Sequence, residues 1–355
     1  REINMSCLVK IKNILIRIRQ NIDVRIKNSR DSNSCGSDEI VILNTAIGSD
    51  NLGDEIIAYY YTNAIKDIVD PKKLYNVATH IKPSDEDVRH LLDAKYAIIT
   101  GTNILSPQME LYSGWKFDNR LIQMRNVLLV GTGWWGYKKP SIYSKYVYRT
   151  ILSKEIVHSV RDEQTLQMLK SIGINNVVNT NCLTMLELDK KCKEIPNKKG
   201  NEVLFTVTGI IGDQNKDKDM IRIIRKNYTN IYFWPQGDID LEYLRKIDDL
   251  EGIEIVPRSL DAYSEFLQKH DELDYIGTRL HGGIHAMQNG KRAIIVAVDN
   301  RAIEMSRDTG LPVIRDTEIC DKLDDLINGE WKTEIHLNES AIGKWYKSFT
   351  KIASQ

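Results

Sequence analysis

The feature that most constrains the fold is a repeated order of short apolar run, polar glycine-containing loop and helical pattern. The apolar run at residues 40–44 leads into the loop at 47–54 and then into a helical pattern that starts at Glu55. The same order recurs after residues 96–100 and 127–130. Short continuous apolar runs are typical of strands buried on both faces, and strands that alternate with helices form a mainly parallel sheet. The repeated order therefore predicts an α/β fold.

The length of the chain predicts two domains. The chain has 355 residues, and single cores stop growing at roughly 250–300 residues. The charged stretch 188–201 interrupts the pattern, and a second series follows, with strands expected at 203–207, 231–234, 253–256, 274–276 and 293–298. We therefore expect two doubly wound, Rossmann-like domains facing a cleft, an N-terminal one at 39–187 and a C-terminal one at 188–338. A C-terminal helix at 339–355 is expected to reach back to the first domain.

Composition excludes several classes of protein. Lys+Arg and Asp+Glu both number 49, so no net charge draws the chain to nucleic acid. The five cysteines are widely spaced and contain no C-x-x-C pair, which argues against a disulfide framework or a zinc site and favours a reducing cytoplasm. No apolar run reaches about 18 residues, so no transmembrane helix is expected.

The N-terminal segment 1–38 is unlike the rest. Residues 1–30 carry eight basic and two acidic residues. Residues 7–27 place apolar side chains at three- and four-residue spacing, which predicts a basic amphipathic helix, and the polar stretch 28–38 resembles a linker. Two interpretations stay open: the helix packs on the body of the protein, or it lies on an anionic membrane surface. The second would make the protein peripheral at the inner face of the membrane.

A glycine-rich loop at 131–136 (GTGWWG) matches the dinucleotide fingerprint G-x-G-x-x-G. The fingerprint requires a helix that opens directly from the loop and an acidic residue about twenty positions on. Pro140 argues against the helix, and the acidic residue is missing. We therefore expect Gly131 and Gly133 to let the backbone approach a ligand or the facing domain.

Two further loops carry polar residues at a junction between strand and helix. Asn51, Gly53 and Asp54 precede the first helix, where they either cap it or present free N–H groups to an anionic or hydroxyl-rich ligand. Arg161 ends a strand, where it either pairs with Asp162 or binds a phosphate or carboxylate through two hydrogen bonds.

The stretch Thr278–His285 (TRLHGGIH) is the most specific. A strand runs into Thr278 and the pattern then turns helical, which places Arg279 and His281 at a helix N-terminus, where anions are attracted. This pairing suits anion binding with proton transfer, and we expect Gly282 and Gly283 to let a ligand approach. A buried structural histidine is the alternative for His281. His281 and His285 are four residues apart and could together bind a metal, but no third ligand accompanies them, so no metal is expected.

Together these stretches resemble the polysaccharide pyruvyl transferase family. The resemblance rests on N-L-G-D at 51–54, the loops after residues 100 and 130, V-R-D at 160–162, R-L-H-G at 279–282 and the Val298-Asp299 pair. It adds Gly101 and Asn103 to the candidate substrate-binding residues. The sequence departs from the family pattern in having few glycines at 101–103, and Asn179–Cys182 where an Asp is common.

The resemblance implies a fold of the glycosyltransferase-B type and an enzyme of polysaccharide biosynthesis. Such an enzyme moves a pyruvyl group from phosphoenolpyruvate to a pair of sugar hydroxyls, forming a ketal on a glycan or lipid-linked saccharide. Phosphoenolpyruvate is then the donor substrate, and no cofactor is expected. Arg279 and Arg161 would hold the donor, His281 would be the general acid, and Asp54 is the candidate base. A nucleotide-sugar-dependent glycosyltransferase and a non-catalytic glycan-binding protein are the alternatives.

Overall fold

The computed structural model describes residues 19, 38–69, 74–111 and 114–354. The expected amphipathic helix at 7–27 and the linker therefore lie outside the described residues, apart from Arg19 and Asp38. The described chain divides into two compact units. The first holds the residues up to Gly48, Thr62–Thr180 and the C-terminal segment from Glu339, and the second holds Ser49–Tyr61 and Asn181–Asn338.

The first unit is built on a parallel sheet in the order β2-β1-β3-β4. A parallel pair, β5 and β6, follows, and a parallel bridge between Thr132 and Val160 connects it to the end of β4. The strands are β1 (Ile40–Asn44), β2 (Leu74–Ala78), β3 (Tyr96–Thr100), β4 (Val127–Val130), β5 (His158–Val160) and β6 (Val177–Asn179). The helices are α3 (Asp85–Asp93), η2 (Asn119–Gln123), α4 (Ile142–Ile151), α5 (Glu163–Ser171), α13 (Glu339–Phe349) and α14 (Lys351–Ser354).

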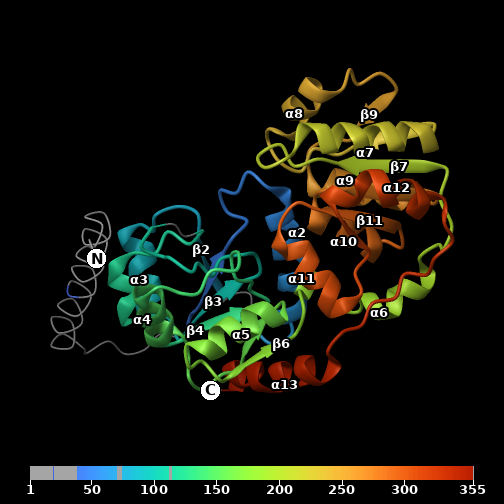
Figure 1. Cartoon of the computed structure of the whole chain (residues 1–355). Coiled ribbons are helices and arrows are strands. Elements are labelled where there is room, and N and C mark those ends of the chain that lie inside the picture. The colour runs from blue at the N-terminus through green and yellow to red at the C-terminus, as the bar shows by residue number, and fades with distance from the viewer. Residues whose placement is uncertain (1–18, 20–37, 70–73, 112–113, 355) are drawn as a thin grey trace, which may run out of the picture. The chain divides into compact units, whose positions relative to one another are not determined.

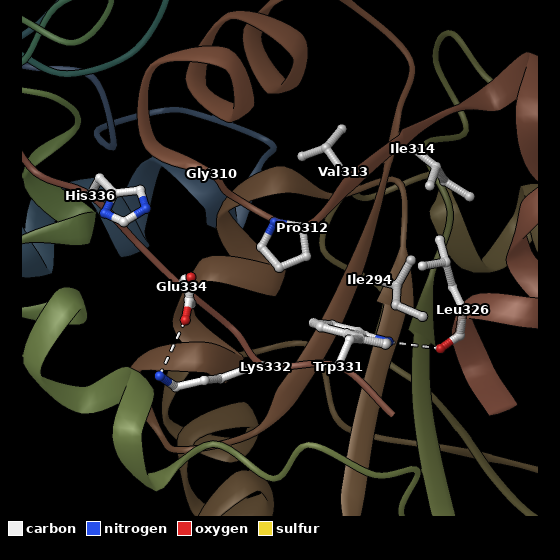
Figure 2. A pocket seen from close by; sticks show the side chains of 10 residues that line it. All are labelled: Ile294, Gly310, Pro312, Val313, Ile314, Leu326, Trp331, Lys332, Glu334 and His336. Atoms are coloured by element: carbon white, nitrogen blue, oxygen red, sulfur yellow. Dashed lines mark hydrogen bonds and ion pairs between the residues drawn. The ribbon is translucent and has the colours of Figure 1, made fainter. Parts of the chain in front are cut away.

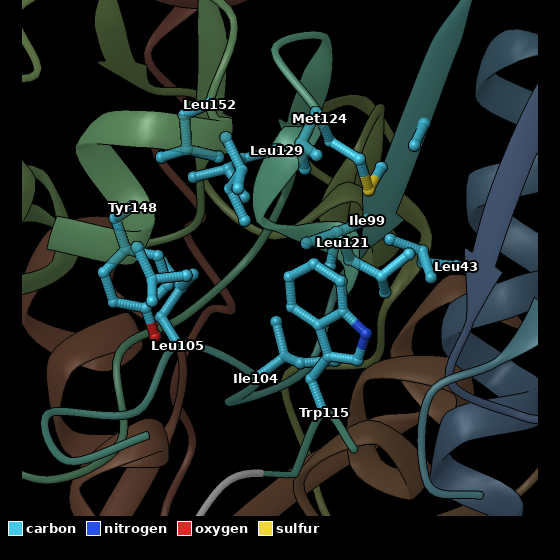
Figure 3. Packing of buried hydrophobic residues seen from close by; sticks show 14 of the residues in the cluster. Leu43, Ile99, Ile104, Leu105, Trp115, Leu121, Met124, Leu129, Tyr148 and Leu152 are labelled. Carbon is cyan, nitrogen blue, oxygen red and sulfur yellow. The ribbon is translucent and has the colours of Figure 1, made fainter. Parts of the chain in front are cut away.

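Alternation along the strands explains why this sheet is buried on both faces. Ile99 and its neighbour in register, Leu129, join the core shown in Figure 3, whereas Ile98 points to the opposite face and is also buried. Side-chain caps set the helix starts. Ser84 forms a capping box at α3, and Asp162 accepts a hydrogen bond of 2.7 Å from the backbone N–H of Thr165 at α5.

The second unit contains a six-stranded parallel sheet in the order β12-β11-β10-β7-β8-β9. Figure 1 labels three of its strands, β7, β9 and β11. Its strands are β7 (Glu202–Thr206), β8 (Asn230–Phe233), β9 (Ile253–Ile255), β10 (Leu273–Gly277), β11 (Arg292–Ala297) and β12 (Val313–Arg315). Its helices are α6 (Leu188–Lys191), α7 (Gln214–Asn227), α8 (Asp240–Ile247), α9 (Leu260–Lys269), α10 (Leu280–Gln288), α11 (Asn300–Thr309) and α12 (Ile319–Asn328), with short 3-10 helices at Leu183–Met185, Cys192–Glu194 and Asp316–Glu318. Helix α2 (Leu52–Ile65) begins in this unit and ends in the first.

Two separate cores cover the two faces of the second sheet. In β11, Ala293 and Ile295 belong to one core, and Ile294 and Val296 belong to the other. Helices α7 and α12 lie side by side over the second core, where Asn227 donates a hydrogen bond to Asp324. The parallel sheets with helices on both faces confirm the predicted doubly wound α/β class. None of the helices in the described part of the chain is long and apolar enough to cross a membrane.

The division into units differs from the expected ranges in two places. Residues 49–61 belong to the second unit, because Leu52 and Ile56 are buried in its core. The second unit also starts at Asn181, before residue 188, because Cys182 and Met185 are buried in the same core. Helix α13 packs with the first unit, where the Ser348 hydroxyl accepts a hydrogen bond of 2.9 Å from the backbone of Val157.

Candidate functional site

The strand order of the second unit creates a switch point between β7 and β10. From these neighbours the chain order runs outward in opposite directions, and ligands of open α/β sheets bind beyond the carboxyl ends of the strands at such a point. The loops that follow the two strands are joined here. The hydroxyls of Thr208 and Thr278 are 2.8 Å apart, and the backbone N–H of Arg279 donates to the Thr206 hydroxyl at 3.3 Å.

Helix α10 starts at this point. Its N-cap residue is Arg279, which provides no side-chain cap, so the first backbone N–H groups receive no capping hydrogen bond from it. The Tyr275 hydroxyl donates to the Arg279 carbonyl at 2.7 Å and holds the turn in place. A helix N-terminus without a side-chain cap is an environment that attracts anions.

The Arg279 side chain is buried and tightly held. Its Nε donates to Asp240 Oδ2 at 3.0 Å and to the Val207 carbonyl at 3.2 Å, and its Nη2 donates to Asp240 Oδ1. Nη1 has no hydrogen-bond partner among the described residues. One part of the guanidinium group is therefore free to bind a ligand.

His281 is the second residue of α10. Its side chain is buried, and its Nε2 lies 3.8 Å from the Cys182 sulfur. Gly282 and Gly283 lie against the protein's own atoms: a Cβ at Gly283 would be 2.7 Å from Ile295, and the Gly282 carbonyl accepts a hydrogen bond from Tyr263. Gly283 therefore lets α10 pack closely on the sheet, and the approach of a ligand to these glycines stays a prediction.

His285 has a structural environment. Burial lowers its pKa from 6.5 to about 4, with a smaller contribution from Lys191. Its two ring nitrogens each lie 2.9 Å from a hydroxyl, that of Tyr60 at Nδ1 and that of Ser264 at Nε2. The imidazole is therefore neutral near pH 7 and occupied on both sides. No group of three metal-ligating side chains occurs in the part of the chain that the structure describes.

Asn51, Gly53 and Asp54 belong to the same unit as Arg279. Asn51 Oδ1 accepts hydrogen bonds from the Gly53 N–H at 3.1 Å and from Gln236 Nε2 at 2.8 Å, and Ser49 donates to Asp54 at 2.6 Å. The expected capping role of Asn51 is thus present in the structure. The segment that follows β8 connects these residues to Arg279, because Gln236 in the loop donates to Asn51 and Asp240, the first residue of α8, accepts from Arg279. Sequence reasoning missed these two residues, and its available signal was the polar stretch after the strand at 231–234.

The first unit brings together Arg161, Asn103 and Gly133. The Arg161 side chain is completely buried. Its Nη2 donates a hydrogen bond to Asn103, and its Nε donates one to Asp162 at 3.3 Å. Its Nη1 has no hydrogen-bond partner among the described residues. Gly133 lies directly against the guanidinium group. Gly101 and Gly131 adopt left-handed conformations, with φ of 53° and 63°. Helix α4 begins only after its N-cap Ser141, as expected for a loop that is not a dinucleotide fingerprint.

A cavity of about 440 Å³ lies elsewhere in the second unit, beside the edge strand β12 (Figure 2). It is lined by Ile294, Gly310, Pro312, Val313, Ile314, Leu326, Trp331, Lys332, Glu334 and His336. One lining residue, Trp331, has the Arg292 guanidinium 4.5 Å from its ring centre. None of the predicted site residues lines this cavity.

Fold and site together define the class: an α/β protein of two doubly wound units, with a buried arginine and an uncapped helix at the switch point of the second. Residues 51–300 match the family model described as polysaccharide pyruvyl transferase. The chain therefore belongs to this family, and the family makes it a transferase that acts on glycans.

A search of curated proteins found no match. Among solved structures, a protein described as a UDP-N-acetylglucosamine 2-epimerase from Listeria monocytogenes is 9% identical with a TM-score of 0.43, covering 89% of this chain and 93% of its own. Arabidopsis thaliana UGT89C1 in complex with UDP is 10% identical with a TM-score of 0.44, covering 89% and 98%.

Proposed function

We propose that the protein transfers a pyruvyl group from phosphoenolpyruvate to two hydroxyls of one sugar in a glycan, forming a cyclic ketal. The observation that carries this proposal is the buried Arg279, with a free Nη1, at the uncapped start of α10 in a member of this family. Phosphoenolpyruvate carries a phosphate and a carboxylate, which match a guanidinium group and a helix N-terminus. Arg161 is the second proposed anion ligand, from the first unit.

The proposed reaction needs acid and base catalysis but no redox step. His281 donates a proton to the methylene carbon C3, which makes C2 electrophilic, and one sugar hydroxyl adds to C2 and loses its proton to a base. Asp54 is the proposed base. The C2–O bond to phosphate then breaks, and a neighbouring hydroxyl adds to C2 and loses its proton, which closes the ring. The products are the ketal and inorganic phosphate, so no cofactor is consumed.

The test supplies purified protein with phosphoenolpyruvate and a panel of glycosides and measures phosphate release, with mass spectrometry of the products. We expect phosphate release that depends on the acceptor, and its loss in His281→Ala and Arg279→Ala. Wild-type rates in both variants would contradict the assignment. A thermal shift with nucleotide-sugars, and none with phosphoenolpyruvate, would favour a glycosyltransferase instead.

We also propose that the acceptor is a lipid-linked saccharide and that residues 7–27 bring the enzyme to the membrane. Eight basic residues in 1–30 would attract an anionic surface. Flotation with anionic liposomes, with and without residues 1–35, tests this proposal. We expect only the longer chain to float, and equal flotation of both would rule membrane contact by this segment out.

A further inference from the structure

The carboxylate of Asp240 is the most heavily engaged group near the candidate site. Asp240 is completely buried, and its two oxygens accept the Gly209 N–H at 3.0 Å, the Gly237 N–H at 2.7 Å and the two donors of Arg279. It thus connects the loop after β7, the loop after β8 and the arginine at the start of α10. A carboxylate buried this deeply is retained only when it is paired and hydrogen-bonded.

The way in which Asp240 holds Arg279 determines what a ligand meets. A guanidinium group has five N–H donors in one plane. Asp240 uses the edge formed by Nε and Nη2, so one hydrogen on Nη2 and both on Nη1 remain, and they form a second edge that can bind an anion through two hydrogen bonds. Gly237 completes the arrangement, because a Cβ there would collide with Arg279 Nη2.

We propose that Asp240, together with Gly237, is a positioning residue that orients Arg279 so that its Nη1–Nη2 edge faces the donor substrate. The proposal rests on the proposed function, in which Arg279 binds phosphoenolpyruvate. Neither residue needs to touch the substrate. Replacing the carboxylate by an amide turns one acceptor into a donor that faces other N–H groups, so Arg279 loses its fixed orientation.

The first test is kinetic. We expect Asp240→Asn to lower kcat/KM for phosphoenolpyruvate by roughly 100-fold, mostly through KM, because a displacement of about 1 Å has effects of this size. Asp274→Asn is the matched control, since Asp274 forms another buried pair, with Arg292 at 3.2 Å, and we expect it to reduce thermal stability with KM unchanged. In an Arg279→Lys background, Asp240→Asn should have little further effect, because it acts through Arg279. Full additivity would overturn the proposal.

The second test needs neither substrate nor removal of the charge. Phenylglyoxal labelling of Arg279, followed by peptide mass spectrometry, reports how firmly the guanidinium group is held. Gly237→Ala keeps the carboxylate and displaces Nη2, so we expect faster labelling and a higher KM; Gly343→Ala, where an added Cβ meets no atom within 4 Å, is the control. Unchanged labelling in both Gly237→Ala and Asp240→Asn would refute positioning. If wild-type protein neither binds nor consumes phosphoenolpyruvate, the proposed function fails, and labelling alone decides the role of Asp240.

Discussion

Asp217 offers a quantitative test of the electrostatics beside the candidate site. This α7 residue is 2% exposed, and it accepts a hydrogen bond of 2.6 Å from the Tyr243 hydroxyl. Burial, followed by repulsion from Asp213, Asp316 and Asp240, raises its pKa from 3.8 to about 6. The folded second unit therefore favours the protonated acid, whereas the unfolded chain ionises near pH 4.

The sign of the effect follows from this direction. The pKa of Asp217 in the folded unit lies above its value in the unfolded chain. The contribution of its protonated carboxyl group to the free energy of unfolding is therefore fully present below about pH 4 and is lost as the pH rises through 6. A rise of about 2 pKa units corresponds to roughly 3 kcal/mol at pH 7. Asparagine does not ionise, so Asp217→Asn should stabilise the unit by up to about 3 kcal/mol at pH 7 and have little effect at pH 4.

Hydrogen exchange of the α7 amides at pH 4 and pH 7, corrected for intrinsic exchange rates, measures this change in stability. The method reports on α7 alone, which matters because the chain has two units that can unfold separately. Asp219→Asn is the matched control in the same helix. Asp219 is paired with Arg222, which lowers its pKa, so its replacement should not stabilise α7 at pH 7. If Asp217→Asn destabilises α7 at pH 7, or changes it equally at pH 4 and pH 7, the reasoning is refuted.

Two further predictions concern the loops around the site. Gly133→Ala places a methyl group against the Arg161 guanidinium group. We therefore expect the free energy of unfolding of the first unit, measured in urea, to fall by about 1–3 kcal/mol, and phosphate release to slow. Gly114→Ala is the control, because its added Cβ meets no atom within 4 Å and should change neither. Asn51→Ala removes an acceptor used by Gln236 and should cost about 1–3 kcal/mol, whereas Asn51→Asp keeps the acceptor. If the two Asn51 variants unfold at the same urea concentration, the capping role is wrong.

Much of the architecture could be predicted because the central strands are apolar on both faces. The strand at 203–207 stands out for this reason, since a buried parallel strand has a nearly continuous apolar run. Strand β2 (Leu74–Ala78) was missed because only Val77 in it is buried, so no such run exists. Strand β12 is only three residues long and ends in Arg315, so it is equally inconspicuous.

The pairing of Asp240 with Arg279 could not be predicted. The two residues are 39 positions apart, and they meet only because the strand order places β10 beside β7 and next but one to β8. Local patterns indicate that a segment is a strand or a helix, but they do not indicate the order in which strands pair. The candidate arginine was therefore visible in the sequence, whereas the carboxylate that orients it was not.

The two units hold their candidate arginines in the same way. Arg161 follows β5 and Arg279 follows β10; each donates through Nε to an aspartate, each has its guanidinium group against a glycine, and each keeps Nη1 without a partner among the described residues. A lysine at either position would offer three donors on one nitrogen, which cannot form the two planar edges that bind a carboxylate and an anion through two hydrogen bonds each. The shared arrangement suits arginine, because the planar guanidinium group can pair with the protein through one edge and, in the proposed function, with an anionic ligand through the other.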